Sequence, residues 1–400
     1  MTDTVLRVGD LVDVTTGRLA YGGEAVARHD GLAIFIPLAA PGERLRVRIT
    51  ERKKNFARAA IEQIIEPASE RRQPPCRHFG ECGGCQLQHM TYEAQLAAKV
   101  GFVRDALERI GRLDWPHEIA MRHANEFGYR GRAQVRIDHK TGRVGFNRRG
   151  SNSVCDVQSC PILAPELDEG LGALRAAVTG TSKSDGVLAN VFQVEMAAGE
   201  SRISFEPSVG ELPGGALRRT LHGTIYTFSP STFFQSNADM LDHLIEEALG
   251  EASGDLALDL FAGVGLFTIQ LARRFKQVIG VEADAKTAKY ALENIIANSV
   301  PNVEVRNSDV EEWVKGFVET KPASLDLILL DPPRTGAANS LVHIVDLRPH
   351  RITYVSCDPT TLARDLRTLV DSGYELSKIT ALDLFPQTYH VETVASLRLR

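Results

Sequence analysis

Short apolar runs separated by turn signals fill the first 65 or so residues of the chain. The turns carry glycine, as in Tyr21-Gly22-Gly23 and Pro41-Gly42. Short strands at this spacing are typical of a small closed β-barrel. We predict five strands, over residues 11–14, 25–27, 32–36, 45–49 and 59–65.

A helix and then a second, mostly β region are predicted after this barrel. Apolar residues recur every three or four positions from Leu96 to Ile110, which places them on one helix face. From Phe127 to Phe228 the pattern indicates short strands interrupted by turns. The predicted strands here cover residues 133–138, 142–147, 191–196 and 224–229.

Predicted helices and strands alternate from Phe233 to the end of the chain. Alternation of this kind favours a doubly wound sheet, in which helices join parallel strands. The predicted strands cover residues 256–261, 278–281, 303–305, 325–330, 351–356, 379–382 and 391–399, and the clearest helices cover 240–249, 268–274 and 285–298.

The length of 400 residues exceeds what one core usually holds. We therefore predict a multidomain α/β protein: a small β-barrel over residues 1–68, a central mixed α+β domain over 69–228, and a Rossmann-like sheet over 229–400. No apolar run reaches the length of a membrane span, and the first residues lack the pattern of a secretory signal. We expect a cytoplasmic protein with no membrane contact, and nothing in the sequence implies an obligate protein partner.

The formal net charge of −5 argues against binding to nucleic acid, but the charge is distributed unevenly along the chain. Residues 1–150 carry 25 basic and 18 acidic residues, whereas the remaining 250 carry 21 and 33. Seven basic residues and one acid, Asp138, lie between Arg130 and Arg149. This asymmetry fits a basic face for phosphates on the first part of the chain, although a solvated surface would have the same composition.

A glycine-bearing turn follows the first strand of the predicted doubly wound sheet. Residues 259–265 read DLFAGVG, and such a turn lets backbone approach a ligand closely. Glu282 ends the next strand, where ribose hydroxyls would lie, and Asp309 follows the third, where an adenine edge would lie. A dinucleotide is the alternative, but Thr268 replaces the third glycine of its fingerprint. An acid at position 259 suits a sulfonium cation better than a pyrophosphate, so we favour S-adenosylmethionine.

Two later strands end in side chains suited to covalent catalysis. Asp331 follows one strand and Cys357 the next, and the carboxyl ends of parallel strands share one crevice. A helix predicted from Thr360 onward would stabilise the Cys357 thiolate. Glu392 begins the last strand. A thiolate that adds to carbon 6 of uracil makes carbon 5 nucleophilic, so that carbon 5 can accept a methyl group. A base must then remove the proton from carbon 5. Cys357 and Glu392 therefore suit methylation of that carbon.

These motifs together resemble a known family. The chain resembles the RNA uridine-5 methyltransferases, a family that includes 23S ribosomal RNA and tRNA enzymes. The motifs that carry the resemblance are, in order, FFQSN (233–237), DLFAGVG, VEAD, DPPR, YVSCDPTTLARDL and FPQTYHVET. The resemblance implies a class I methyltransferase sheet, Cys357 as nucleophile and Glu392 as proton acceptor. It also implies that Gln235, Phe261, Glu282, Asp309 and Asp331 line the S-adenosylmethionine site. The first barrel resembles a TRAM domain, an OB-like barrel of RNA-modifying enzymes, although a generic barrel is the alternative.

The chain departs from this family at three motif positions. Ala262 stands where many members have cysteine, Leu266 where an asparagine often contacts the cofactor, and Asp358 where asparagine is common. A side-chain contact from Leu266 to the cofactor is therefore not expected.

Four cysteines suggest a metal centre. Cys76, Cys82 and Cys85 lie within ten residues, and Cys160 or Cys155 is the fourth candidate. Cys160 is favoured because Cys155 lies on a β-like segment where a packed thiol is expected. Such a set suits zinc or an iron–sulfur cluster, and the resemblance implies a 4Fe–4S cluster with Cys76, Cys82, Cys85 and Cys160 as ligands. We expect a structural or RNA-binding role for it rather than a redox step.

Several functions remain open at this point. The main hypothesis is an enzyme that methylates carbon 5 of a uridine in RNA, with 23S ribosomal RNA favoured over tRNA. The alternatives are an RNA-binding iron–sulfur protein without turnover and a cytosine-5 methyltransferase. The presence of both Cys357 and Glu392 argues against the former. The latter usually presents its thiol after a proline, whereas Ser356 precedes Cys357 here.

Overall fold

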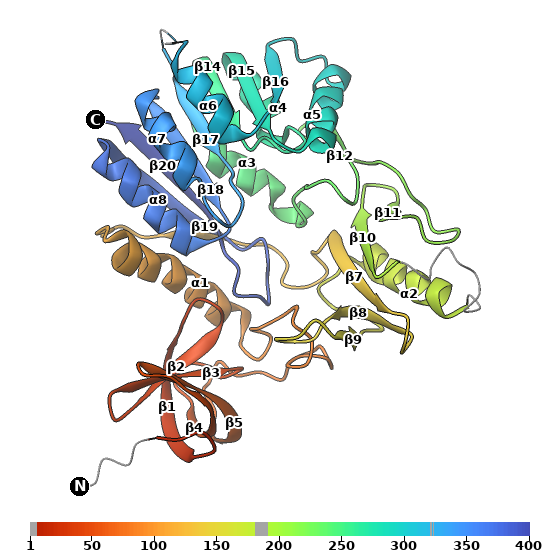
Figure 1. The fold of residues 1–400 in the computed structure, drawn as a ribbon, viewed down its shortest axis with the longest axis vertical. Helices are drawn as coiled ribbons and strands as arrows, with labels where there is room; N and C mark the ends of the chain where they lie inside the picture. The colour runs from red at the N-terminus through yellow and green to blue at the C-terminus, as the bar shows by residue number, and fades with distance from the viewer. Residues whose placement is uncertain (1–5, 181–190, 321, 323) are drawn as a thin grey trace.

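The computed structural model describes residues 6–180, 191–320, 322 and 324–400. A barrel lies at one end of an elongated molecule, a large sheet flanked by helices lies at the other, and a smaller sheet lies beside them (Figure 1). Multiple domains and a doubly wound sheet are therefore confirmed.

The N-terminal segment is a closed barrel with the strand order β1-β2-β3-β5-β4. Inward positions alternate along the strands, and Ile34, Ile36, Leu45 and Val47 are fully buried. This confirms the five predicted strands. Their bounds are β1 (Leu11–Leu19), β2 (Glu24–His29), β3 (Leu32–Pro37), β4 (Arg44–Arg52) and β5 (Phe56–Glu66).

The smaller sheet has five strands in the order β11-β10-β7-β8-β9, and α2 packs on it. Helix α2 (Pro165–Gly180) was not predicted, because Gly170 and Gly172 weaken the helical pattern of its sequence. The packing explains Gly170, since a Cβ there would lie 2.6 Å from Cδ1 of Ile203. The strands are β7 (Arg132–Asp138), β8 (Arg143–Asn147), β9 (Val154–Asp156), β10 (Gln193–Ala198) and β11 (Ile203–Glu206).

The large sheet has the strand order β16-β15-β14-β17-β18-β20-β19-β6. Its first five strands are parallel, and β20 enters antiparallel between β18 and β19. The strands are β14 (Gly254–Leu260), β15 (Phe275–Glu282), β16 (Val303–Asn307), β17 (Leu327–Leu330), β18 (Arg351–Ser356), β19 (Tyr374–Leu382) and β20 (Glu392–Leu399).

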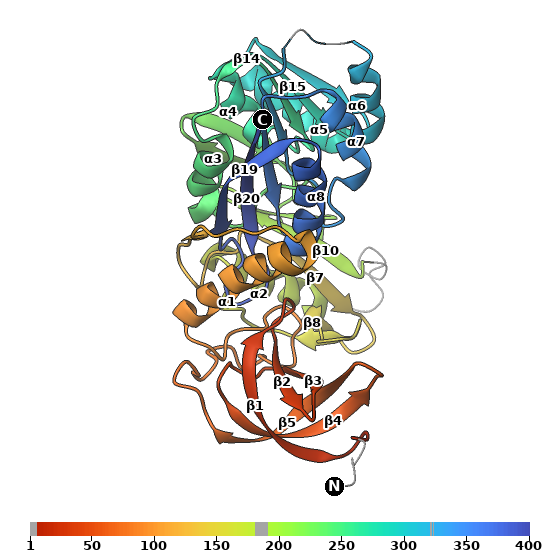
Figure 2. The same ribbon diagram turned by 90° about the vertical axis from the view of Figure 1, so that its left-hand side faces the viewer.

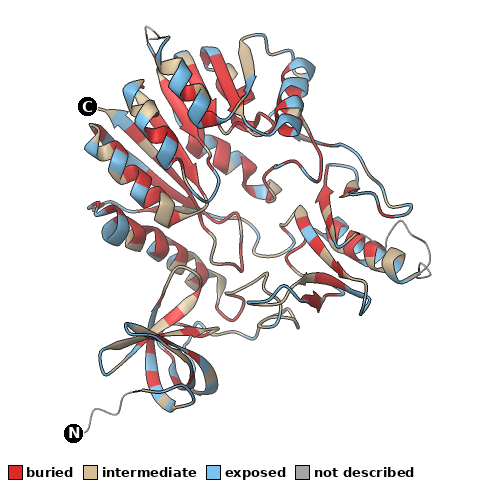
Figure 3. Cartoon of the chain, in the orientation of Figure 1, coloured by how far each residue is buried: buried red, intermediate tan, exposed pale blue. Residues whose placement is uncertain are grey.

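Helices cover both faces of this sheet, and the buried residues concentrate in its strands (Figure 3). One apolar core joins the sheet to α3 (Leu241–Leu249), α4 (Leu266–Ala272) and α5 (Ala285–Ala297). The other core joins it to α1 (Tyr92–Ala106), α6 (Val310–Val318), α7 (Ala338–Asp346) and α8 (Pro359–Asp371). No helix among the described residues is long and apolar enough to cross a membrane.

Two segments assigned above to the central domain pack instead with the large sheet. Helix α1, its π-helical extension Leu107–Gly111 and strand β6 (Ala120–Arg122) join it, and β6 pairs with β19. Figure 2 shows α1 lying between the barrel and the sheet.

The hairpin of β12 (Leu217–Leu221) and β13 (Thr224–Phe228) contacts α5, where Oδ1 of Asn294 accepts the Thr227 N–H at 2.7 Å. The domain boundary predicted between residues 228 and 229 therefore separates this hairpin from the helix on which it packs. Local sequence patterns, from which the boundary was predicted, do not show such packing.

Candidate active site and cysteine cavity

The strand register brings Cys357 and Glu392 to the same end of two neighbouring strands. In the antiparallel pair β18–β20, Ser356 faces Thr393. Cys357 directly follows Ser356, and Glu392 directly precedes Thr393. Glu392 is also among the charges that raise the pKa of Cys357, so the thiol and the carboxyl group lie near each other at the carboxyl end of β18.

Cys357 is half-buried at the end of β18. Burial and the charges of Glu392 and Asp331 together raise the pKa of Cys357 to about 12, although the Arg334 guanidinium lowers it. Desolvation and the carboxyl groups thus disfavour the thiolate in the RNA-free protein, and they oppose the stabilisation expected from the helix N-terminus. Arg334 belongs to the DPPR motif, but its effect on Cys357 was not predicted. Its guanidinium also lies 3.2 Å from Nε2 of His390.

Three acidic residues, Asp259, Asp331 and Glu392, influence one another near the ends of neighbouring strands. Burial raises the pKa of Glu392 well above its usual value, and Asp331 adds to the shift. Burial and the charge of Asp259 raise the pKa of Asp331 to about 7. Asp259 is fully buried, and its pKa is raised to about 7 by burial although the Thr268 hydroxyl donates to it. A site with this many desolvated carboxyl groups favours a bound cation.

The turn after β14 has the backbone shape of a nucleotide-binding turn. Phe261, Gly263 and Gly265 all have positive φ angles, of 67°, 58° and 90°. Such a conformation is costly for a side chain as large as phenylalanine, and strain of this kind is concentrated at functional sites. The Gly263 N–H donates to Oε2 of Glu282 at 2.9 Å, so the turn and the end of β15 are held together.

Asp309 and Gln235, the other two residues expected to bind the cofactor, lie in different settings. Asp309 is exposed and caps α6, where its Oδ1 accepts the Glu312 N–H at 3.1 Å. It follows Ser308, whose N–H donates to the Glu282 carbonyl at 3.1 Å, so the two acids are neighbours. Gln235 is buried on the FFQSN segment, which Arg132 holds through a hydrogen bond of 3.3 Å to the Phe234 carbonyl.

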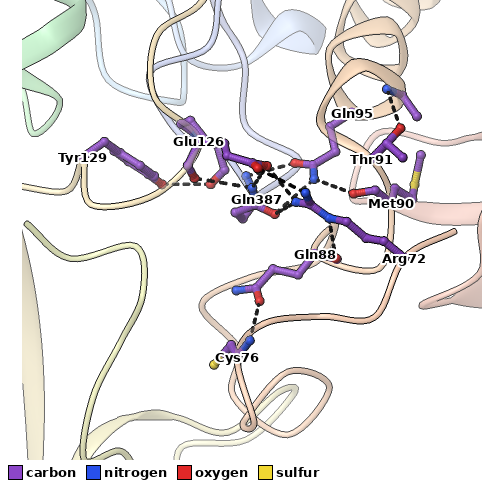
Figure 4. Close-up of polar contacts among 11 residues, drawn as sticks. Arg72, Cys76, Gln88, Met90, Thr91, Gln95, Glu126, Tyr129 and Gln387 are labelled. Carbon is purple, nitrogen blue, oxygen red and sulfur yellow. Dashed lines mark hydrogen bonds and ion pairs between the residues drawn. The ribbon is translucent and has the colours of Figure 1, made fainter. Parts of the chain in front are cut away.

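A network around Gln387 connects the segment before Glu392 to the cysteine-bearing segment (Figure 4). The Gln387 carbonyl accepts the N–H groups of Gln86 and Leu87, both at 3.0 Å. Its buried side chain accepts from Gln95 and donates to Glu126, both at 3.0 Å. Buried, fully bonded networks of this kind fix a unique arrangement, so the two segments are rigidly joined.

Cys76, Cys82, Cys85 and Cys160 line one cavity of about 340 Å³. Arg130, Arg136 and Arg148 line the same cavity. Cys155 is not among its lining residues. That cysteine is fully buried, and its Sγ lies 4.0 Å from Nδ1 of His78. The arrangement thus favours Cys160 over Cys155 as the fourth member, as expected.

The fold and the site define a methyltransferase of the doubly wound class with an added nucleic-acid-binding barrel. Residues 216–399 match the model of the tRNA (Uracil-5-)-methyltransferase family, and residues 5–61 match that of the TRAM domain. The 23S rRNA (uracil(1939)-C(5))-methyltransferases RlmD of Salmonella typhi and Aeromonas salmonicida are 36% and 33% identical to this chain, each over 96% of it and 95% of the relative. The chain therefore belongs to the RNA uracil-5 methyltransferase family, whose members use S-adenosylmethionine.

A solved structure shows the same fold. The Pyrococcus abyssi tRNA (uracil-54, C5)-methyltransferase, in complex with S-adenosyl-L-homocysteine, matches with a TM-score of 0.71 at 24% identity. The match covers 96% of this chain and 100% of that one. The barrel, the smaller sheet and the large sheet are thus arranged as in that protein.

Proposed function

We propose that this protein methylates carbon 5 of a uridine in 23S ribosomal RNA, with Cys357 as nucleophile and Glu392 as base. The observation that carries the proposal is the position of Cys357 and Glu392 beside the Ser356–Thr393 pair at the carboxyl end of β18, where the charge of Glu392 raises the pKa of Cys357. The names of the relatives support ribosomal RNA over tRNA. A ribosomal RNA substrate would in turn place the protein in the cytoplasm.

The proposed chemistry uses one thiol and one carboxylate in sequence. The Cys357 thiolate adds to carbon 6, and the electron pair of the 5,6 double bond makes carbon 5 nucleophilic. S-adenosylmethionine supplies the methyl group that carbon 5 accepts. The Glu392 carboxylate then removes the proton from carbon 5, the double bond re-forms, and the thiolate leaves. Burial raises the pKa of both groups in the RNA-free protein, so we expect ligand binding to lower both pKa values.

Five residues are proposed to bind S-adenosylmethionine. The strained turn supplies Phe261, and Glu282 beside it has carboxylate lone pairs free for ribose hydroxyls. The desolvated carboxyl group of Asp331 suits the cationic end of the molecule. Gln235 and Asp309 complete the set from the FFQSN segment and the start of α6.

A groove between the barrel and α1 is proposed as part of the RNA path. It has a volume of about 830 Å³ and runs from the barrel to Thr360, three residues after Cys357. Arg18, Arg28 and Arg109 line it, together with the aromatic ring of Phe35. Cationic side chains beside an aromatic ring suit the phosphates and bases of a single strand.

The four cysteines are proposed to hold a 4Fe–4S cluster. Four thiols around one cavity match the ligand set of such a cluster, and the arginines beside them compensate its negative charge. Zinc also accepts four thiolates, and the two differ in iron content and visible absorbance. The rigid connection through Gln387 supports a structural role for the cluster rather than a redox step.

The matched variants Cys160→Ala and Cys155→Ala test this ligand set. Protein purified without oxygen should contain about four iron atoms per chain and absorb visible light. Cys160→Ala should lose most of the iron and absorbance, whereas Cys155→Ala, outside the cavity, should keep both. Loss of iron from Cys155→Ala alone would show that Cys155, not Cys160, is the fourth ligand. Bound zinc without visible absorbance would show that the four cysteines hold zinc, not an iron–sulfur cluster.

Nucleoside mass spectrometry tests the proposed function. RNA from cells lacking this protein should lack 5-methyluridine in 23S ribosomal RNA, and the purified protein with S-adenosylmethionine should restore it. A loss of 5-methyluridine from tRNA alone would show that the protein acts on tRNA, not on ribosomal RNA. If neither RNA changes, the RNA-binding hypothesis without turnover takes its place.

A further inference from the structure

The turn between β1 and β2 of the barrel reaches the proposed nucleophile. Oη of Tyr21 lies 3.3 Å from Oδ2 of Asp358, to which its hydroxyl donates, and 3.5 Å from the carbonyl oxygen of Cys357. In sequence, 337 residues separate Tyr21 from Asp358. A side chain of the RNA-binding barrel thus contacts the backbone that presents the thiol.

The packing of this turn holds the Tyr21 ring in place. The ring lies edge-on to Phe102 of α1 and to Tyr389, with centroid distances of 5.9 and 5.3 Å. Gly23 is equally confined, since a Cβ there would lie 3.2 Å from Cβ of Gln86 and 3.3 Å from Cδ2 of Leu87. The turn is therefore wedged between α1, the cysteine-bearing segment and the segment that precedes Glu392.

The Asp358 carboxylate connects Tyr21 to the start of α8. Its Oδ1 caps the helix by accepting the N–H groups of Thr360 and Thr361, at 2.8 and 3.2 Å. Its Oδ2 is then free to accept the Tyr21 hydroxyl. Burial, together with the charge of Asp358, raises the pKa of the Tyr21 phenol, so the hydroxyl stays protonated and remains a donor.

We propose that Tyr21 is a positioning residue that holds the Cys357–Asp358 turn, so that the barrel completes the active site in addition to binding RNA. The inference rests on the proposed role of Cys357 as nucleophile. The reason is geometric: a nucleophile displaced by about 1 Å reacts about 10²-fold more slowly. Loss of the hydroxyl releases one of the contacts that set the position of the thiol.

Steady-state kinetics of Tyr21→Phe provide the first test, because the substitution keeps the ring and removes only the hydroxyl. With unmodified 23S ribosomal RNA, kcat should fall about tenfold while the KM for RNA stays within about twofold of the parent. Tyr374→Phe is the matched control. It also removes a buried hydroxyl hydrogen bond, of 3.1 Å to the Pro349 carbonyl. Tyr374 begins β19 and lies at the opposite end of the strands from Cys357. An unchanged kcat, or a loss confined to KM, overturns the proposal.

Measurements on the RNA-free protein separate this inference from the proposed function. The amide hydrogens of Thr360 and Thr361 should exchange at least about fivefold faster in Tyr21→Phe than in the parent or in Tyr374→Phe. Asp358→Asn should cause a similar change, and the double variant should add little to it, because both act on one contact. If exchange stays unchanged, Tyr21 does not hold the turn. If exchange accelerates but the parent methylates no RNA, only the proposed function fails.

Discussion

Replacing Cys357 with alanine should reduce methyl transfer to RNA by about 10⁴-fold or more and should abolish the covalent RNA–protein adduct. Uracil carbon 5 becomes nucleophilic only after addition at carbon 6, and no other thiol of the described chain lines this edge of the sheet. The measurement is transfer of labelled methyl groups from S-adenosylmethionine to unmodified 23S ribosomal RNA. Gel electrophoresis under denaturing conditions detects the adduct.

Cys155→Ala is the control for this substitution. Cys155 is fully buried in the smaller sheet and contributes neither to the sheet edge nor to the cysteine cavity, so methyl transfer should persist. Binding of S-adenosylmethionine by the Cys357→Ala protein verifies that its site is intact. Turnover within about tenfold of the parent would assign the nucleophile elsewhere.

Glu392→Gln should trap the RNA on the enzyme after methylation. The amide cannot accept the proton from carbon 5, so the adduct should form at a normal rate but break down about 10²- to 10⁴-fold more slowly. The expected result is a denaturant-stable complex that already contains the transferred methyl group. Single-turnover experiments with labelled S-adenosylmethionine distinguish methyl transfer from release.

The Glu392→Gln substitution should leave the fold intact. Burial and Asp331 raise the pKa of Glu392 well above its usual value, which favours the neutral acid, and glutamine is neutral and of similar shape. The free energy of unfolding should change by less than about 1 kcal/mol. Glu375→Gln, on the exposed start of β19, is the control and should release RNA normally. Release of methylated RNA at the parent rate by Glu392→Gln would show that another group is the base.

Motifs at strand ends were predictable because parallel strands align their carboxyl ends. Asp331 and Cys357 follow strands whose apolar runs are unmistakable, and the expected crevice follows from the alternation of helix and strand. The five barrel strands were equally clear, because glycine-bearing turns mark their limits. In contrast, α2 was missed, because two glycines lower its helical propensity and only packing against β10 and β11 explains them.

The sequence by itself determined the family, the doubly wound sheet, the barrel and the residue types of the site, since these depend on local patterns and short motifs. Only the tertiary structure decided that Cys160 joins the other three cysteines, that α1 and β6 extend the large sheet, and that Arg334 acts on Cys357. It also decided that burial and nearby carboxyl groups raise the pKa of the Cys357 thiol and that Tyr21 contacts Asp358. These features depend on burial and on contacts between segments hundreds of residues apart, and neither leaves a local pattern in the sequence.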